Sequence, residues 1–523
     1  MIIAVVKALA LNEVRLRLRR LSSLVTLLAV AIISWTMIAD PATGTALIVK
    51  EDARVLYTSS ALAVGSASLS CILFGLAGFF LVRGRVSEDI RSGAGSVIAA
   101  TSVSNTLLVL SRWLGGVAYL GGLVLVFMLS ILALHLVRGD GPIQLHIYFQ
   151  TYLLLMLPMV LFTVSCATLF DSYAPLLGKG GDVLYFFVWV AAMMVAIPLT
   201  EAGLASGSIP LVELLDFTGM GSAMLTSTTA LNSNHIAMGG GDFKAALAPV
   251  LMPDYIWSYE LGLMRMATAL LALLPLVPAV LLFHRFSPDQ VKVARASRRR
   301  SPLEVLNSAL RPLSNLVAPP LFRLASTLPG LAGQVVGDIA LSLVTSPSAV
   351  LALLAASTAA LVVPQQALGA VLACAVAFWG VLISDVSTRD STADTAGMTG
   401  VVPGGVVQRY VRQFLATGAI GLLFTGVAAA RFAPEQPVRA LAVLTGVACL
   451  SALASLFGRT SSTSRLFLAL FLFGLYVALN VTQIAVIDIV GFNGAANAGS
   501  VGIHFAIAAG ALASGYLWNR RAV

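Results

Sequence analysis

Two charged stretches with the same layout interrupt an otherwise apolar chain. In each, acidic and basic residues follow a long apolar run, small residues come next, and an arginine opens the following run. The charged residues are Glu88, Asp89, Arg91 and Arg112 in the first stretch and Arg389, Asp390, Asp394 and Arg412 in the second. Mixed charges of this kind suit a reversible polar contact with another protein. The alternative is that they only keep a loop in water.

Motifs for catalysis are absent from the sequence. No G-x-x-x-x-G-K-[ST] occurs, and the nearest stretch, Leu177–Gly180, lacks the first glycine and the hydroxyl residue. There is no H-E-x-x-H, no G-x-S-x-G and no glycine-rich dinucleotide loop. The 5 histidines are scattered and the 4 cysteines are isolated. We therefore expect no catalytic residue, no metal site and no cofactor in this chain, which also lacks visible machinery for ATP hydrolysis.

Polar residues inside the apolar runs are few, and one group stands out. Asn480 and Gln483 are spaced to share a helix face, and Asp488 follows near the end of the same run. Polar groups within a membrane can line a transport pathway. The alternative is hydrogen bonding between helices near the outer surface.

The composition indicates an integral membrane protein. Apolar residues make up 58% of the chain and charged residues 11%, with a mean hydropathy of +0.93, whereas soluble domains carry about 25% charge. The apolar runs are continuous rather than alternating with period two, so they predict helices and not a barrel. The fold class is therefore an all-α polytopic membrane protein.

The apolar runs predict about twelve membrane spans in two six-helix halves. One run is too long for a single crossing, and Pro364 interrupts it, so it predicts two spans joined by a tight turn. The runs are Leu21–Ala39, Val55–Val82, Trp113–Val137, Ile147–Phe170, Val183–Thr200, Met266–Phe283, Ile339–Ser384 (two spans), Gln413–Ala430, Ala440–Gly458, Leu466–Ile487 and Val501–Trp518.

The positions of basic residues predict the orientation. Most of the 32 Lys and Arg residues fall on the side of the N-terminus, while acidic residues show no such bias. This is the positive-inside pattern, so both termini are expected in the cytoplasm and the chain in the cell inner membrane. The net charge of +9 is then an orientation signal facing anionic lipids, and no nucleic-acid partner is expected.

The polar segments between the runs predict the domain organisation. Residues 1–284 form the first half, 285–338 a basic cytoplasmic linker with interfacial helices, and 339–523 the second half. An outer segment, 201–265, is expected to carry short helices on the outer face. The basic N-terminal stretch before Leu21 resembles a signal peptide, but its interspersed apolar residues favour an amphipathic helix on the inner leaflet.

The chain resembles the ABC-2 type permeases, the membrane subunits of ATP-driven exporters. The resemblance lies in the amphipathic basic helix Leu11–Arg20, the loop Arg83–Arg112, the long outer segment before the sixth span, and the Phe283–Pro288 exit from that span. It covers most of the first half, and the second half by layout alone. This chain departs from the family by fusing two six-span units, and its second half lacks the outer segment.

The resemblance implies a function for the two charged stretches. In such permeases the loop after the second span holds a coupling helix that docks on a cytoplasmic ATPase. Carried over, this implies docking by Glu88, Asp89 and Arg91 in the first half, and by Arg389, Asp390 and Asp394 in the second. ATP and Mg²⁺ are then expected in two separate ATPase subunits, and this chain forms the export pathway.

Two other functions fit parts of the sequence. A secondary carrier built from a six-plus-six repeat also has twelve spans and a central cytoplasmic loop, although buried ionisable residues are not evident here. A membrane enzyme acting on a lipid-linked substrate would place its site in the outer segment, where Glu213 and Asp216 are close in sequence.

Overall fold

A computed structural model of the protein describes residues 2–19, 21–195, 211–254, 256–283, 302–393, 395, 398 and 405–521. The chain forms two compact units, Met1–Arg299 and Arg300–Val523. The division falls inside the expected linker, and the helices of 302–338 belong to the second unit. The calls at 201–210, 284–301 and Asp394 lie outside the described residues.

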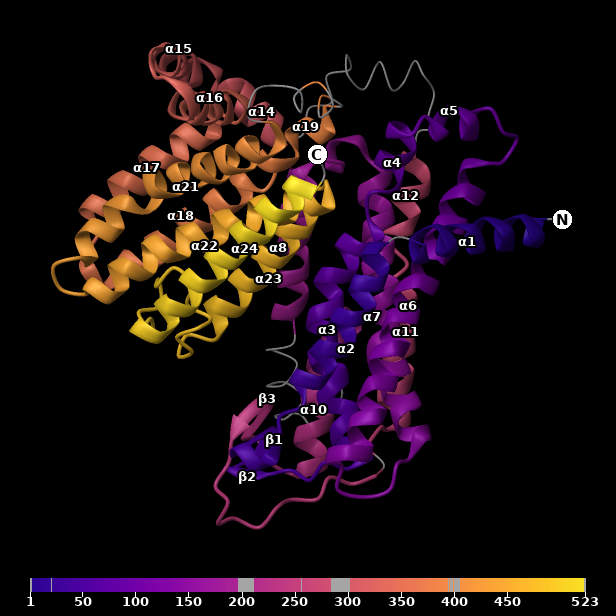
Figure 1. Cartoon of the computed structure of the whole chain (residues 1–523). Coiled ribbons are helices and arrows are strands. Elements are labelled where there is room, and N and C mark those ends of the chain that lie inside the picture. Colours follow the sequence, from indigo (N-terminus) through magenta and orange to yellow (C-terminus); the bar gives the residue numbers. More distant parts are fainter. Residues whose placement is uncertain are drawn as a thin grey trace. The chain divides into compact units, whose positions relative to one another are not determined.

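The first unit is a helical bundle with one small sheet (Figure 1). Its elements are α1 (Ile2–Leu18), α2 (Leu21–Met37), η1 (Pro41–Thr43), β1 (Thr45–Lys50), β2 (Ala53–Arg54), α3 (Ser59–Val82), α4 (Arg85–Arg91), α5 (Ala94–Ala99), α6 (Asn105–Arg138), α7 (Leu145–Ser172), η2 (Ala174–Leu176), α8 (Lys179–Met194), η3 (Leu211–Leu215), α10 (Met220–Leu231), β3 (Ile236–Asp242), α11 (Tyr259–Leu271) and α12 (Leu276–Leu282).

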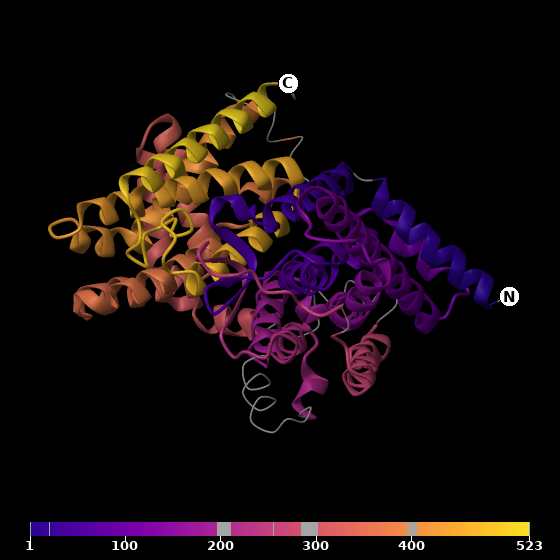
Figure 2. The ribbon, with the colours of Figure 1, turned by 90° about the horizontal axis from the view of Figure 1, so that it is seen from below.

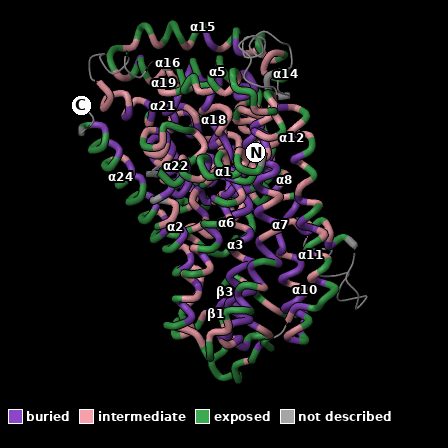
Figure 3. Tube along the Cα trace, turned by 90° about the vertical axis from the view of Figure 1, so that its right-hand side faces the viewer, coloured by how far each residue is buried: buried purple, intermediate pink, exposed green. Residues whose placement is uncertain are grey.

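Hydroxyl residues start three of the apolar helices of this unit. The side chains of Thr58, Ser104 and Ser258 precede α3, α6 and α11, and each accepts a hydrogen bond from a backbone N–H of the first turn. Of these helices α3 is the most deeply enclosed, and it packs along α7. Figure 3 shows α3 and α7 largely buried.

The segments that connect the helices of the first unit lie at two opposite ends of the bundle. At one end, the side chain of Asn105 donates to the carbonyl of Phe283 across 3.4 Å, next to α4 and α5. At the other, Arg54 lies 3.5 Å from Asp140, and the amide of Gln144 donates to the carboxylate of Asp254 across 2.9 Å. Successive long helices therefore run in alternate directions.

A three-stranded antiparallel sheet lies at the end of the first unit away from α4. Its strand order is β2-β1-β3, with Val49 opposite both Arg54 and Ala237. The strand β3 comes from the expected outer segment, which thus contains a strand as well as the predicted short helices η3 and α10. In the part of the chain that the structure describes, the other regular elements are helices.

Helix α1 lies across the bundle rather than along it. In Figure 1 it runs sideways while α3, α6 and α7 stand upright, and in Figure 2 it is seen at full length while they are nearly end-on. Ile3, Leu11 and Leu18 are exposed on it, whereas Glu13 and Arg17 are buried. Such an orientation fits the predicted helix at a membrane surface.

The second unit is entirely helical among its described residues. Its elements are α14 (Pro302–Ala309), α15 (Arg311–Thr327), α16 (Gly330–Thr345), α17 (Ser348–Val362), η4 (Gln365–Ala367), α18 (Leu368–Ile383), η5 (Val386–Thr388), α19 (Arg389–Thr392), α21 (Gly405–Phe432), α22 (Pro437–Ser461), α23 (Arg465–Asn480) and α24 (Ala498–Arg521). The predicted turn at Pro364 is present, since α17 ends at Val362 and η4 follows.

Eight helices of the described chain are long and apolar enough to cross a membrane, or up to nine if the bent pair α16 and α17, which meet at 102°, is one span. These agree with most of the predicted runs. The other predicted runs contain shorter described helices: α2, α8 and α23 have 17, 16 and 16 residues. The chain is thus a helical, multi-span membrane protein.

Candidate functional site

The first charged stretch contains a short helix, α4, fixed at its start by an aspartate. Gly84 precedes the helix with φ +98°, a conformation that glycine adopts readily. The backbone N–H groups of Gly84 and Arg85 donate to Oδ2 of Asp171 across 2.8 and 3.0 Å. A carboxylate also balances the positive end of the helix dipole. Asp171 belongs to α7, so α4 is attached to the end of a long helix.

A buried arginine next to this helix joins three long helices. Arg83, which follows α3, forms ion pairs with Asp182 of α8 and, across 3.7 Å, with Asp171 of α7. Its guanidinium also lies over the rings of Phe79 and Phe170, 5.1 and 5.6 Å from their centroids. A paired arginine in this position makes the end of the bundle rigid.

Five charged side chains around α4 form a second set of ion pairs, here named the α4 cluster: Glu13, Arg85, Glu88, Asp89 and Arg112. Arg85 lies 3.1 Å from Glu13, 3.1 Å from Glu88 and 3.4 Å from Asp89. Arg112 of α6 lies 2.5 Å from Asp89. Helices α1, α4 and α6 are therefore joined through side chains of opposite charge.

The predicted residues of the first stretch separate into two roles. Asp89 is 2% exposed and paired with Arg112, so both hold α4 in place rather than face a partner. The side chain of Glu88 is 44% exposed. Together with exposed Ile90 and Val97, it forms the accessible face of α4 and α5. Arg91 ends α4, and its side chain lies outside the described part of the chain.

The second charged stretch also forms ion pairs, here named the α21 cluster: Asp338, Asp385, Arg389, Asp390, Arg409 and Arg412. Arg409 and Arg412 of α21 lie 2.8 Å from Asp390 and 2.7 Å from Asp338. Arg389 lies 3.5 Å from Asp385, and it donates to the hydroxyl of Ser342 across 3.0 Å. The structure thus places Arg389, Asp390 and Arg412 in one cluster, in which Asp390 pairs with Arg409 and Arg412 with Asp338.

The predicted polar group of the second unit does not assemble. Helix α23 ends at Asn480, so Asn480 and Gln483 do not share a helix face, and both are exposed. Asp488 is fully buried and accepts hydrogen bonds from the backbone N–H groups of Asn493 and Ala495, each across 3.2 Å. It stabilises a turn, which is the ordinary use of a carboxylate beside free backbone donors.

Sequence reasoning missed the residues that complete the α4 cluster and its support. Glu13 lies in the predicted basic helix Leu11–Arg20, and Arg83 and Arg85 lie in the loop Arg83–Arg112, but none of them was singled out. Asp171 and Asp182 lie just outside the predicted apolar runs. The usable signal was the rarity of acidic residues beside spans, because an ionised carboxylate at a membrane boundary needs a partner. Their pairing depends on helix packing, which the sequence does not display.

A third group of charges is fully buried near the opposite end of the first unit. It comprises Glu213 and Asp216 beside η3, Ser222 of α10 and Arg265 of α11. Arg265 donates to the carbonyl of Asp216 across 2.5 Å and lies 3.7 Å from its carboxylate. The sequence analysis noted both acids but found no buried ionisable residues in the spans, and it overlooked Arg265.

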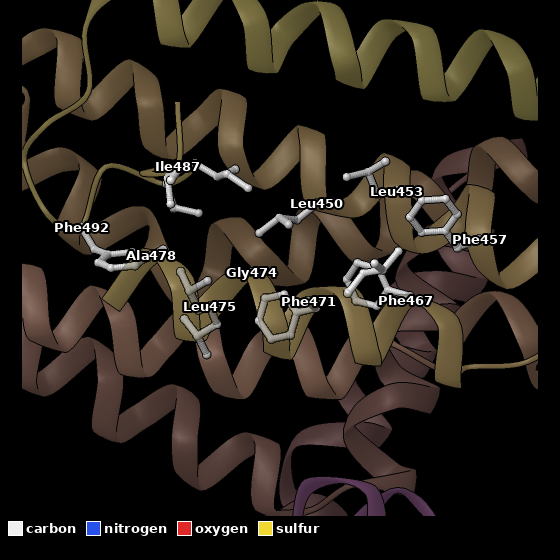
Figure 4. Close-up of a pocket in the computed structure, with 14 residues that line it drawn as sticks. Leu450, Leu453, Phe457, Phe467, Phe471, Gly474, Leu475, Ala478, Ile487 and Phe492 are labelled. Atoms are coloured by element: carbon white, nitrogen blue, oxygen red, sulfur yellow. The ribbon is translucent and has the colours of Figure 1, made fainter. Parts of the chain in front are cut away.

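The second unit contains an apolar cavity of about 120 Å³ between α18, α22 and α23 (Figure 4). Leu450, Phe457, Phe467 and Phe471 point into it, and the segment before Phe492 closes one side. The side chains that line the cavity are all apolar. The cavity therefore suits an apolar group, and none of these side chains can bind an ion.

Among the described residues, no group of three or more His, Cys, Asp or Glu is placed to hold a metal ion. The charged clusters are ion pairs within the protein, and they position helices. Comparisons of the chain with family models, with curated proteins and with solved structures find no match.

Proposed function

We propose that this chain is the membrane permease of an ATP-driven exporter and that its ATPase is a separate polypeptide. In this proposal the chain crosses the inner membrane about twelve times, and both termini lie in the cytoplasm. The single observation that supports it most is the attachment of α4, whose exposed side chains sit on a helix tied by ion pairs to α1 and α6 and by backbone hydrogen bonds to α7.

The attachment of α4 matters because an ATPase can move the membrane spans only through a rigid contact. A push on a flexible loop is absorbed by the loop, whereas α4 has buried ion pairs on one side and an exposed face on the other. Force on Glu88 or Ile90 therefore reaches three long helices directly. In the second unit, the α21 cluster ties α19 to α21 in a similar way and gives a second candidate contact.

Co-purification tests the proposal. The full chain, solubilised in mild detergent from its native host, is expected to retain an ATPase subunit that contains a Walker A motif. Reconstitution in lipid is then expected to increase the rate of ATP hydrolysis. Transport driven by an ion gradient, with no ATPase bound at any stage, contradicts the proposal. A chain with neither activity also counts against it.

One observation favours a second candidate, an ion-coupled carrier. The buried group formed by Glu213, Asp216 and Arg265 is of the kind found on ion pathways. Proteoliposomes distinguish the two functions: the carrier takes up its substrate with a proton or cation gradient and no ATP. The exporter requires ATP and its partner.

A further inference from the structure

The buried group at η3 contains more hydrogen-bond acceptors than hydrogens. Glu213, Asp216, Ser222 and Arg265 are each 0% exposed. The hydroxyl oxygen of Ser222 lies 2.9 Å from Oε1 of Glu213 and 2.9 Å from Oδ2 of Asp216. A serine hydroxyl has one hydrogen. If both carboxyl groups were ionised, one of these two contacts would join two oxygens with no hydrogen between them.

Asp216 has the environment of an ionised carboxylate. Its two oxygens accept from the backbone N–H groups of Gly219 and Ser222, each across 2.9 Å, and from the hydroxyl of Thr218 across 3.0 Å. The guanidinium of Arg265 lies 3.7 Å away. Several donors and a cation favour the charged form of a carboxyl group. The additional hydrogen therefore belongs to Glu213.

Glu213 has the environment of a neutral carboxylic acid. Its Oε2 is buried and has no hydrogen-bond partner, which costs far less for the carbonyl oxygen of an acid than for an ionised oxygen. Burial raises the pKa of Glu213 to about 7, although the Ser222 hydrogen bond and the charge of Arg265 oppose this rise. The hydrogen-bond chain then runs from the Glu213 acid to Ser222 and from Ser222 to Asp216.

We propose that Glu213 is a proton-binding site of this protein, occupied in mildly acidic solution and emptied as the pH rises through neutral. Among the described residues, the charged and titratable groups that face it are Asp216 beside η3, Arg265 from α11 and, beyond them, Cys71 from α3. Helix α7 contributes backbone carbonyl groups to Arg265. Loss of the proton leaves two buried anions that share one cation and one hydroxyl hydrogen, so one of the two contacts of Ser222 no longer contains a hydrogen.

Infrared spectroscopy on the full chain in lipid tests the proposal. The carbonyl stretch of a protonated carboxylic acid is recorded while pH is raised, and one such band is expected to disappear near neutral pH. Glu213→Gln removes that band, because the amide resembles the protonated acid but does not titrate. The matched control is Glu260→Gln, which changes an exposed glutamate of α11 and leaves the band. A band that survives in Glu213→Gln overturns the proposal.

A second variant is independent of how well Glu213→Gln folds. Ser222→Ala removes the hydroxyl that joins Glu213 to Asp216, so the midpoint of the band is expected to shift. An unchanged midpoint contradicts the hydrogen-bond chain. Neither measurement involves ATP, an ATPase or transport, so its outcome is separate from that of the proposed function.

Discussion

The guanidinium Nε of Arg265 donates to the carbonyl oxygen of Leu154 across 3.0 Å, in place of a hydrogen bond that α7 cannot make. In a regular helix this carbonyl accepts from the N–H four residues later, but that residue is Pro158, which has none. The proline thus frees a buried acceptor, and Arg265 occupies it while also neutralising Asp216. One side chain thus supplies a donor to a free carbonyl and a counter-charge to a buried carboxylate.

Arg265→Met is therefore expected to be strongly destabilising. The substitution keeps the apolar length of the side chain, but it leaves the carbonyl of Leu154 without its donor and the carboxylate of Asp216 without its counter-charge. Removal of one partner from a buried ion pair costs about 3–5 kcal/mol. The thermal unfolding midpoint of the detergent-solubilised chain measures the loss, with Arg323→Met at an exposed position of α15 as control. Equal midpoints for the two variants would contradict this account.

The adjacent acids Glu88 and Asp89 are expected to respond differently to charge reversal. Glu88 is partly exposed, so Glu88→Lys changes the free energy of unfolding by about 0.5 kcal/mol or less. Asp89 is buried between Arg85 and Arg112, so Asp89→Lys places a third cation there and costs more than about 3 kcal/mol. Thermal unfolding of both variants gives the comparison. Similar losses would mean that α4 is not held as described.

Under the proposed function, Glu88→Lys also lowers the ATP hydrolysis that the permease stimulates, and the fold stays intact. The matched control is Glu435→Lys, which reverses an exposed charge between α21 and α22 and is expected to leave stimulation unchanged. Full stimulation in Glu88→Lys removes this face of α4 from the docking contact.

The stability of the protein is expected to fall as pH rises from about 4.5 to about 7, through Glu213. Its pKa is raised on folding from 4.5 to about 7, so the folded chain keeps its proton in a range where the unfolded chain has released it. Stability from this group is complete below the lower value and lost above the higher one. The full loss is about 3 kcal/mol. Unfolding midpoints across this range are expected to show the decline in the wild type and in Glu260→Gln, and a smaller decline in Glu213→Gln.

The apolar runs predicted the helices because the hydrophobicity of a segment is visible in the segment itself and does not depend on distant residues. The break at Pro364 could be placed to within two residues of the end of α17, since proline and the glutamines after it disfavour a continuing helix. The two charged stretches could be located for the same reason. Their ion pairs could not be predicted, because Glu13 meets Arg85 only through the crossing of α1 over the bundle.

The predicted polar group of the second unit shows where inference from neighbouring residues fails. Asn480 and Gln483 were spaced for one helix face, but α23 ends at Asn480, and the segment that follows turns back along α22. The burial of Asp488 depends on that turn. Likewise, the proton-binding role of Glu213 depends on a serine nine residues away and on Arg265 from another helix, and no spacing in the sequence brings the three together.

Two arginines that open apolar runs, Arg112 and Arg412, have acidic partners in different places. Arg112 pairs with Asp89 of its own charged stretch, whereas Arg412 pairs with Asp338 of α16 across 2.7 Å. We expect a double-mutant cycle of Asp338→Asn and Arg412→Gln to give a coupling energy of about 0.5–3 kcal/mol, measured from unfolding midpoints. Asp390→Asn with Arg412→Gln is the control pair and is expected to couple less. A larger coupling in the control pair would reassign the partner of Arg412.

Close packing between α22 and the segment before Phe492 gives a final test. A Cβ on Gly446 of α22 would lie 2.3 Å from the carbonyl oxygen of Ile489, a backbone atom that cannot rotate away. Gly446→Ala is therefore expected to lower stability by about 1–3 kcal/mol. Gly426 of α21 is the matched control, because a Cβ there meets no atom within 4 Å. Gly426→Ala is expected to raise stability by about 0.5–1 kcal/mol, since alanine loses less conformational freedom in a helix. Shifts of the unfolding midpoint in opposite directions for the two variants support this packing. An unchanged midpoint in Gly446→Ala contradicts it.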